Sequence, residues 1–207
     1  MMPRPSGMYL AFFFQILIAL NMAYAFGIGD YNAGFFALLM FIFTLVPYWV
    51  AKKLDIEFPW FVFFLISLAL WFHTAGFIQG FYLTFYPWYD KVAHLVGGIS
   101  VALLAFLGVI FIDRYWEMKL TEPFIVGFTL IFGLAMAAAW EIYEFTIDTL
   151  FGGSLAGRMQ VSLGDTVLDM IFVLIGSVIV AVIAIVWFRT HNVEDALKNH
   201  HENENLP

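Results

Sequence analysis

AWEIYEFTID, residues 139–148, closes an apolar run that begins at Pro123 and is long enough to cross a lipid bilayer. As a helix, the run from Pro123 to Glu141 rises about 27 Å, close to the ~30 Å of a hydrocarbon core. Glu141, Glu144 and Asp148 then follow at spacings of three and four, which places three carboxylates on one helical face. Because ionisable groups at the edge of a bilayer are costly, this face is a candidate functional site.

The composition excludes an ordinary soluble domain. Of the 207 residues, 63% are hydrophobic, 20% are aromatic and only 12% are charged, which is typical of a membrane protein. The chain contains no cysteine, so disulfides, thiolate metal sites and cysteine nucleophiles are excluded. The net charge of -7 and the lack of a basic surface argue against nucleic acid as a partner.

Hydrophobic runs predict an all-α fold, a bundle of six transmembrane helices within residues 1–189, followed by a polar tail over 190–207. The expected spans are about 8–26, 34–50, 59–80, 90–112, 123–150 and 165–188. The segment 81–89, rich in Tyr and Trp, is expected at a membrane–water interface. The sequence leaves open whether the first helix is retained, since Ala23-Tyr24-Ala25 resembles a signal-peptidase site.

The distribution of Lys and Arg predicts the orientation of these spans. Six spans leave both ends of the chain on one side, and cytoplasmic segments usually carry the excess of basic residues. With the N-terminus inside, the outer segments hold only Lys91 and Arg158. The inner segments hold the other basic residues: Arg4, Lys52, Lys53, Arg114, Lys119, Arg189 and Lys198. We therefore expect a multi-pass membrane protein whose termini are cytoplasmic.

This topology brings polar residues from three spans to the outer face. Asp90 and His94 open the fourth span, Asp165 and Asp169 open the sixth, and the acidic stretch closes the fifth. We expect one cluster there, with these metal ligands: Asp90, His94, Glu141, Glu144, Asp165 and Asp169. The expected catalytic residues are His94, Glu141 and Glu144. His73, in the outer half of the third span, could join them.

Simpler structural explanations stand beside these assignments. Asp90 in a first helical turn is stabilised by the helix dipole, and Ser162 with Asp165 resembles a capping box. Asp148 could be an exposed residue at a helix end. The two outer cations, Lys91 and Arg158, either neutralise the carboxylates or bind an anionic head group of a substrate.

Three motifs carry a resemblance to known families. At Asp90-Lys91-x-x-His94, the WEIYE stretch 140–144 and Asp165-Thr166-x-x-Asp169-Met170, the chain resembles the YjdF-like family of bacterial and archaeal inner-membrane proteins. The resemblance covers roughly residues 10 to 190. It implies the membrane fold, a location in the inner membrane of a prokaryote and the importance of these motifs, but it supplies no reaction. The Asp-Lys-x-x-His motif is also similar to the VanZ-like family, linked to glycopeptide-antibiotic tolerance, which points toward cell-envelope lipids.

Three functions remain open from the sequence. The first is a metal-dependent hydrolase or transferase acting on a lipid or cell-envelope substrate, with Mg, Mn, Zn or Fe as the cofactor. The second is a proton- or cation-coupled transporter or a membrane protein that binds a small ligand. The third is a structural or partner-binding protein whose charged residues join helix ends. The sequence does not identify the substrate, the metal or the oligomeric state.

Overall fold

The computed structural model describes residues 5–151 and 162–190, which form six long helices and one short helix. The helices are α1 Pro5–Gly27, α2 Tyr31–Leu54, α3 Trp60–Ile78, α4 Phe81–Thr84, α5 Trp88–Tyr115, α6 Glu122–Phe151 and α7 Leu163–Thr190. All except α4 are long and apolar enough to cross a membrane. No strand occurs in these two ranges. The predicted all-α bundle with six candidate spans is therefore confirmed.

The helix boundaries differ from the ends of the expected spans by up to four residues. The second helix begins at Tyr31, because the Asp30 side chain caps it by accepting a 3.0 Å hydrogen bond from the Ala33 N–H. The fourth long helix begins at Trp88 and is preceded by α4, where the sequence predicts only an interfacial aromatic segment. The two additional residues at the start of α5 place Asp90 inside its first turn.

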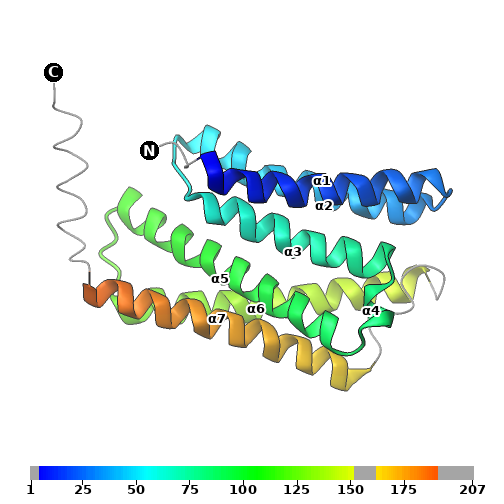
Figure 1. Cartoon of the computed structure of the whole chain (residues 1–207). Coiled ribbons are helices and arrows are strands. Elements are labelled where there is room, and N and C mark those ends of the chain that lie inside the picture. Colours follow the sequence, from blue (N-terminus) through cyan, green and yellow to red (C-terminus); the bar gives the residue numbers. More distant parts are fainter. Residues whose placement is uncertain (1–4, 152–161, 191–207) are drawn as a thin grey trace.

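The six long helices form two groups of three (Figure 1). α1, α2 and α3 pack on one another, as do α5, α6 and α7, and α3 joins the groups by packing on α5. Successive long helices run in opposite directions, so α1 begins and α7 ends at the same end of the bundle (Figure 1). Which end faces the cytoplasm stays a prediction from the basic residues.

Glycines allow α5 and α7 to approach closely. A Cβ atom at Gly98 would lie 2.5 Å from the carbonyl oxygen of Val173, and one at Gly176 would lie 2.7 Å from the carbonyl oxygen of Leu95. Neither position can accept a larger side chain without moving the backbones apart, because the nearest atoms are themselves backbone. This crossing fixes the first turns of α5 and α7 side by side.

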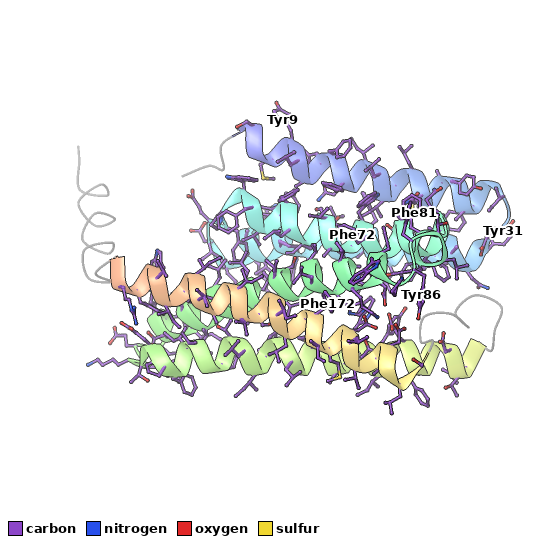
Figure 2. The ribbon with its side chains drawn as sticks, turned by 60° about the horizontal axis from the view of Figure 1, so that its bottom comes forward. Tyr9, Tyr31, Phe72, Phe81, Tyr86 and Phe172 are labelled. Atoms are coloured by element: carbon purple, nitrogen blue, oxygen red, sulfur yellow. The ribbon has the colours of Figure 1, made fainter. Side chains whose placement is uncertain are left out.

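The outer surfaces of the helices suit a lipid environment. Long apolar side chains such as Ile131 and Ile183 are exposed. Figure 2 shows Tyr31, Phe81 and Tyr86 at the end of the bundle that carries α4, with Tyr9 toward the opposite end. Tyrosines at both ends of an apolar bundle are typical of proteins that cross a bilayer.

Candidate functional site

Charged side chains from three helices meet at the end of the bundle where α5 and α7 begin. We call them the polar cluster: Asp90, Lys91, His94, Glu141, Glu144, Asp165 and Asp169. Asp90 is half-buried and all the others are buried. Such burial of charged groups is rare unless they are paired or hold a cation.

Lys91 lies at the centre of the carboxylates contributed by α5 and α7. Its Nζ atom is 3.0 Å from Asp90 Oδ2, 2.6 Å from Asp165 Oδ1 and 2.7 Å from Asp169 Oδ1. An ammonium group has three N–H donors, and here each finds a carboxylate acceptor. Lys91 therefore neutralises part of the cluster and ties the two helix starts together.

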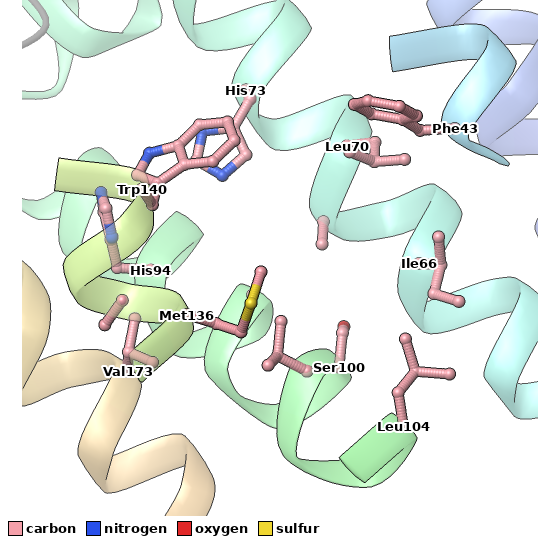
Figure 3. A pocket seen from close by; sticks show the side chains of 14 residues that line it. Phe43, Ile66, Leu70, His73, His94, Ser100, Leu104, Met136, Trp140 and Val173 are labelled. Atoms are coloured by element: carbon pink, nitrogen blue, oxygen red, sulfur yellow. The ribbon is translucent and has the colours of Figure 1, made fainter. Parts of the chain in front are cut away.

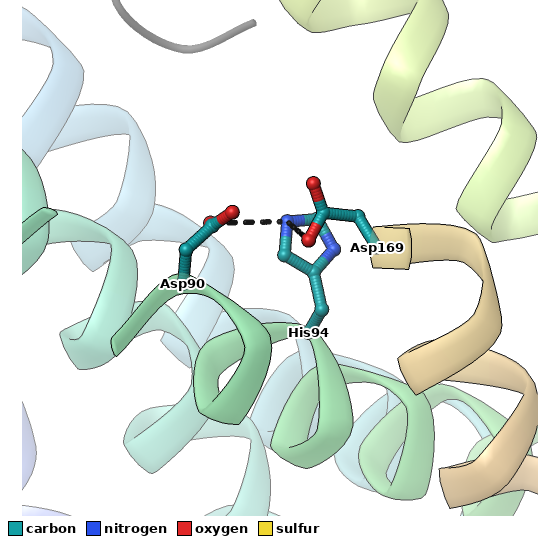
Figure 4. Close-up of side chains that lie close together, drawn as sticks. All are labelled: Asp90, His94 and Asp169. Carbon is teal, nitrogen blue, oxygen red and sulfur yellow. Dashed lines mark ion pairs between the residues drawn. The ribbon is translucent and has the colours of Figure 1, made fainter. Parts of the chain in front are cut away.

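His94 lies one helical turn after Asp90 and faces two of these carboxylates, those of Asp90 and Asp169 (Figure 4). Its Nε2 atom is 3.4 Å from Asp90 Oδ1 and 3.8 Å from Asp169 Oδ1. The side chain is only 4% exposed, yet Nε2 has no hydrogen-bond partner among the described residues. A buried ring nitrogen without a hydrogen-bond partner costs free energy, and a metal ion or a water molecule is the kind of partner that would remove this cost.

Glu141 and Glu144 approach His94 from α6. Both are buried, and each can offer an oxygen within 4.8 Å of a His94 nitrogen and of the other glutamate. Asp90, His94 and Asp169 satisfy the same condition. The cluster therefore contains two adjacent groups of three candidate ligands, and His94 belongs to both.

The separations suit a divalent cation. Oxygen donors on opposite sides of Mg²⁺ lie about 4.2 Å apart and those across Ca²⁺ about 5 Å apart, given the usual metal–oxygen distances. The donor atoms of each group, at most 4.8 Å apart, match this range.

A second set of side chains holds these candidate ligands in place. The indole N–H of Trp140 donates a 2.8 Å hydrogen bond to Glu144 Oε1. The Trp140 ring lies against His73 with ring centres 4.5 Å apart, and the His73 ring meets that of His94 at 5.9 Å. Contacts of this kind orient metal ligands and tune their basicity.

Tyr82, on the short helix α4, completes this second set. Its hydroxyl group and His73 Nδ1 form a 2.7 Å hydrogen bond. Burial and the nearby carboxylates of Asp90 and Glu144 raise the pKa of Tyr82 well above its usual range. The phenol therefore stays protonated at neutral pH and keeps its hydrogen bond to the histidine.

An apolar cavity begins at the rings of His73, His94 and Trp140 and extends away from the polar cluster into the bundle (Figure 3). Its volume is about 230 Å³. His73, His94 and Trp140 lie at one end, and Ile66 and Leu104 lie at the other (Figure 3). Side chains from both three-helix groups line it, so the cavity lies at their junction.

The structure brings most of the expected residues together. The two candidate ligand groups contain five of the expected metal ligands: Asp90, His94, Glu141, Glu144 and Asp169. Asp165 lies in neither group and contacts Lys91 instead. Asp165 also has its backbone N–H bonded to the Ser162 hydroxyl at 3.2 Å, which is one of the two hydrogen bonds of a capping box. Arg158, the second expected substrate-binding residue, lies outside the described residues.

Two residues of the site have no role in the sequence analysis. Trp140 precedes Glu144 by one helical turn, and this spacing is a signal that could have suggested the hydrogen bond. Tyr82 sits in a connector with many aromatic residues, and nothing local distinguishes it from its neighbours. Its contact with His73 depends on how α4 folds back, which the sequence pattern does not specify.

The fold and the cluster together define a polytopic helical membrane protein with a buried group of acids, one lysine and one histidine at one end of its bundle. The chain belongs to the family described as predicted membrane protein (DUF2238), which matches residues 9–190. It is 29% identical over 142 residues to an uncharacterised protein of Thermotoga maritima, covering 66% of this chain and 69% of that protein. No solved structure matches. The expected membrane-protein family is supported, while the YjdF-like and VanZ-like names stay expectations.

Proposed function

We propose that the polar cluster binds one or two divalent metal ions and that the protein is a metal-dependent hydrolase or transferase acting on a lipid or cell-envelope substrate. The proposal rests mainly on His94 Nε2, a buried nitrogen without a hydrogen-bond partner among the described residues. It faces carboxylates on two sides. A metal ion satisfies that nitrogen and the surrounding acids at once.

The charge of the cluster supports a bound cation. The five carboxylates are opposed by a single lysine, and the histidine is the only other basic side chain in the cluster. Carboxylates that share a buried site repel one another and must be neutralised by protons or by a cation. A divalent ion next to His94 compensates for the negative charge of the carboxylates that Lys91 does not neutralise.

The donor atoms narrow the choice of metal. Carboxylate oxygens dominate both candidate groups, which favours Mg²⁺ or Mn²⁺, and the histidine also suits Zn²⁺ or Fe²⁺. Bound at this position, the ion supplies a Lewis acid for a phosphoryl or carbonyl group. His94, Glu141 and Glu144 are the residues we place at the reacting atoms.

Lys91 and Asp165 receive supporting roles in this proposal. The three donors of Lys91 are already engaged by aspartates, so the lysine neutralises the cluster rather than binding a head group. Asp165 holds that lysine from the start of α7. Arg158 remains our proposed contact for an anionic head group.

One observation favours a purely structural role as the second candidate. Lys91 joins the starts of α5 and α7 through Asp165 and Asp169, and such a network can stabilise a helix pair without any ligand. That role gives His94 Nε2 two nearby carboxylates, Asp90 and Asp169, but leaves it without a hydrogen bond among the described residues. A coupled transporter is less well supported, because the space next to His94 is apolar rather than a polar path.

Metal content tests the proposal. We expect detergent-purified protein to contain a stoichiometric divalent metal, measured by inductively coupled plasma mass spectrometry. Replacement of one ligand from each helix, in His94→Ala, Glu141→Gln and Asp169→Asn, should remove that metal.

Asp148→Asn is the matched control, because it removes one acidic group from the same helix as Glu141 but belongs to neither candidate group. This variant should keep its metal. If the wild-type protein holds no metal even after reloading with Mg, Mn, Zn and Fe, the metalloenzyme proposal is wrong and the structural role gains support.

A further inference from the structure

The cavity next to His94 has the properties of a binding site for hydrocarbon. It is lined by apolar side chains from α2, α3, α5, α6 and α7, and it is not fully closed. An apolar cavity of about 150 Å³ is already large enough to stay dry and bind a benzene-sized ligand. At about 230 Å³, this cavity exceeds that size.

Three of the four polar side chains that line the cavity are engaged elsewhere, and the fourth, His94, faces the carboxylates of the polar cluster. Ser100 Oγ donates to the Val96 carbonyl at 2.8 Å and lies 3.1 Å from that of Leu65. Trp140 donates to Glu144, and His73 is bonded to Tyr82. An apolar occupant therefore leaves none of these groups without a partner, whereas a polar occupant would find few groups to bind.

The shape of the cavity fits a single extended chain. From His94 to Leu104 it follows α5 for ten residues, which is about 15 Å at the helical rise. A helix of that length occupies about 1,200 Å³, given a diameter near 10 Å, so a helix from another protein or a second copy does not fit. An unbranched alkyl chain is much thinner and can follow this path.

From these observations we infer that the cavity binds the hydrocarbon tail of a membrane lipid, which places the head of the same lipid at the polar cluster. His94 lines the cavity and also belongs to both ligand groups, so tail site and cluster are continuous. This inference rests on the proposed function, because it makes the lipid tail the part of the substrate that positions the reacting group. Binding energy from a remote tail is a common source of such positioning.

Gly97 offers a way to block the cavity selectively. It lines the cavity, and a Cβ atom there meets no other atom within 4 Å. A leucine at this position would grow into the empty space rather than into a neighbouring helix. Gly108 lies on the same helix, also has open space for a Cβ, and does not line the cavity.

Photo-crosslinking tests the tail site directly. The protein is placed in phosphatidylglycerol nanodiscs whose lipid carries a diazirine in the acyl chain, then irradiated, digested and analysed by mass spectrometry. We expect labelling of Ala69, Ala137 and Val173, which line the cavity and are buried. Ile131, which is 71% exposed, serves as the reference for ordinary contact with surrounding lipid.

The variants separate tail binding from chance contact. In Gly97→Leu, labelling of the buried positions should fall about tenfold relative to Ile131, as expected when an overfilled site excludes its ligand. In Gly108→Leu it should stay at the wild-type level. Ala137→Leu narrows the cavity from α6 and gives a second test if Gly97→Leu does not fold, as judged by gel filtration.

The outcomes distinguish the two proposals, because crosslinking does not require a metal. If Ile131 is labelled and the buried positions are not, the tail site is wrong even when the cluster binds metal. Equal labelling in Gly97→Leu and Gly108→Leu also overturns it. If the buried positions are labelled in a protein that binds no metal, the tail site stands and the metalloenzyme proposal falls.

Discussion

Lys91 is the residue on which the polar cluster depends most. It is 3% exposed and contacts three aspartates from two helices. Removal of one partner from a buried ion pair leaves an uncompensated charge, which typically costs about 3–5 kcal/mol. The cost is high here because the remaining acids face one another.

We expect Lys91→Met to lower the thermal unfolding temperature of the purified protein by about 10 °C, the shift that this loss implies for a chain of this size. The measurement is thermal unfolding in detergent, followed by intrinsic fluorescence. Adding Asp165→Asn and Asp169→Asn to the same variant should restore part of the loss, because it removes the unpaired charges.

The control for this prediction is Lys53→Met, which removes an exposed lysine on α2. Its unfolding temperature should stay within about 2 °C of wild type, since surface substitutions usually change stability little. An unchanged unfolding temperature for Lys91→Met would show that the ion pairs of this lysine do not stabilise the folded protein.

At the level of elements, the crossing of α5 and α7 positions the cluster. Gly98 and Gly176 allow the two backbones to approach closely, and this approach brings Lys91 within reach of Asp165 and Asp169. The side chains therefore meet because of glycines two turns deeper in the bundle. Packing and ion pairing depend on the same helix contact.

Gly98→Ala should destabilise the protein by about 1–3 kcal/mol, because the new methyl group would lie 2.5 Å from the Val173 carbonyl oxygen. Thermal unfolding measures the effect, and metal content should fall with it if the cluster is a metal site. Gly97→Ala, one residue earlier, faces open space and should unfold like the wild type. Equal stability of the two variants contradicts the proposed role of the crossing.

At the level of the whole molecule, the two three-helix groups contribute different parts of the candidate site. The polar cluster lies within the α5, α6 and α7 group, while the cavity lies at the junction with the first group. The ring of His73 on α3 contacts the ring of Trp140 on α6 at the end of the cavity that adjoins the polar cluster. The first group therefore contributes one wall of the cavity and supports His94 from the side.

The basic residues predict which end of the molecule faces outward. We expect a green fluorescent protein fused at the C-terminus to fluoresce, and alkaline phosphatase fused after Tyr86 to be active, because one reporter works inside and the other outside. Phosphatase fused after Asp55, in a predicted cytoplasmic loop, is the control and should be inactive. The reverse pattern would place the polar cluster on the cytoplasmic side.

The sequence by itself determined the fold class and the composition of the site. Runs of about 20 apolar residues are long enough to cross a bilayer, and in lipid their backbone N–H and C=O groups are satisfied by the hydrogen bonds within a helix. Because the number of long helices is even, α7 ends at the end of the bundle where α1 begins (Figure 1). Helical spacing then placed Asp90 with His94, and Glu141 with Glu144, on shared faces. Antiparallel connections brought these faces to one end of the bundle.

Only the tertiary structure decided which of these side chains meet. Lys91 and Asp165 are 74 residues apart in sequence, and their contact depends on the rotation and closeness of α5 and α7, which single-helix periodicity does not contain. The cavity depends in the same way on how α3 and α6 pack around α5. Spacing along one helix is a local property, whereas contacts between helices depend on the packing of the whole bundle.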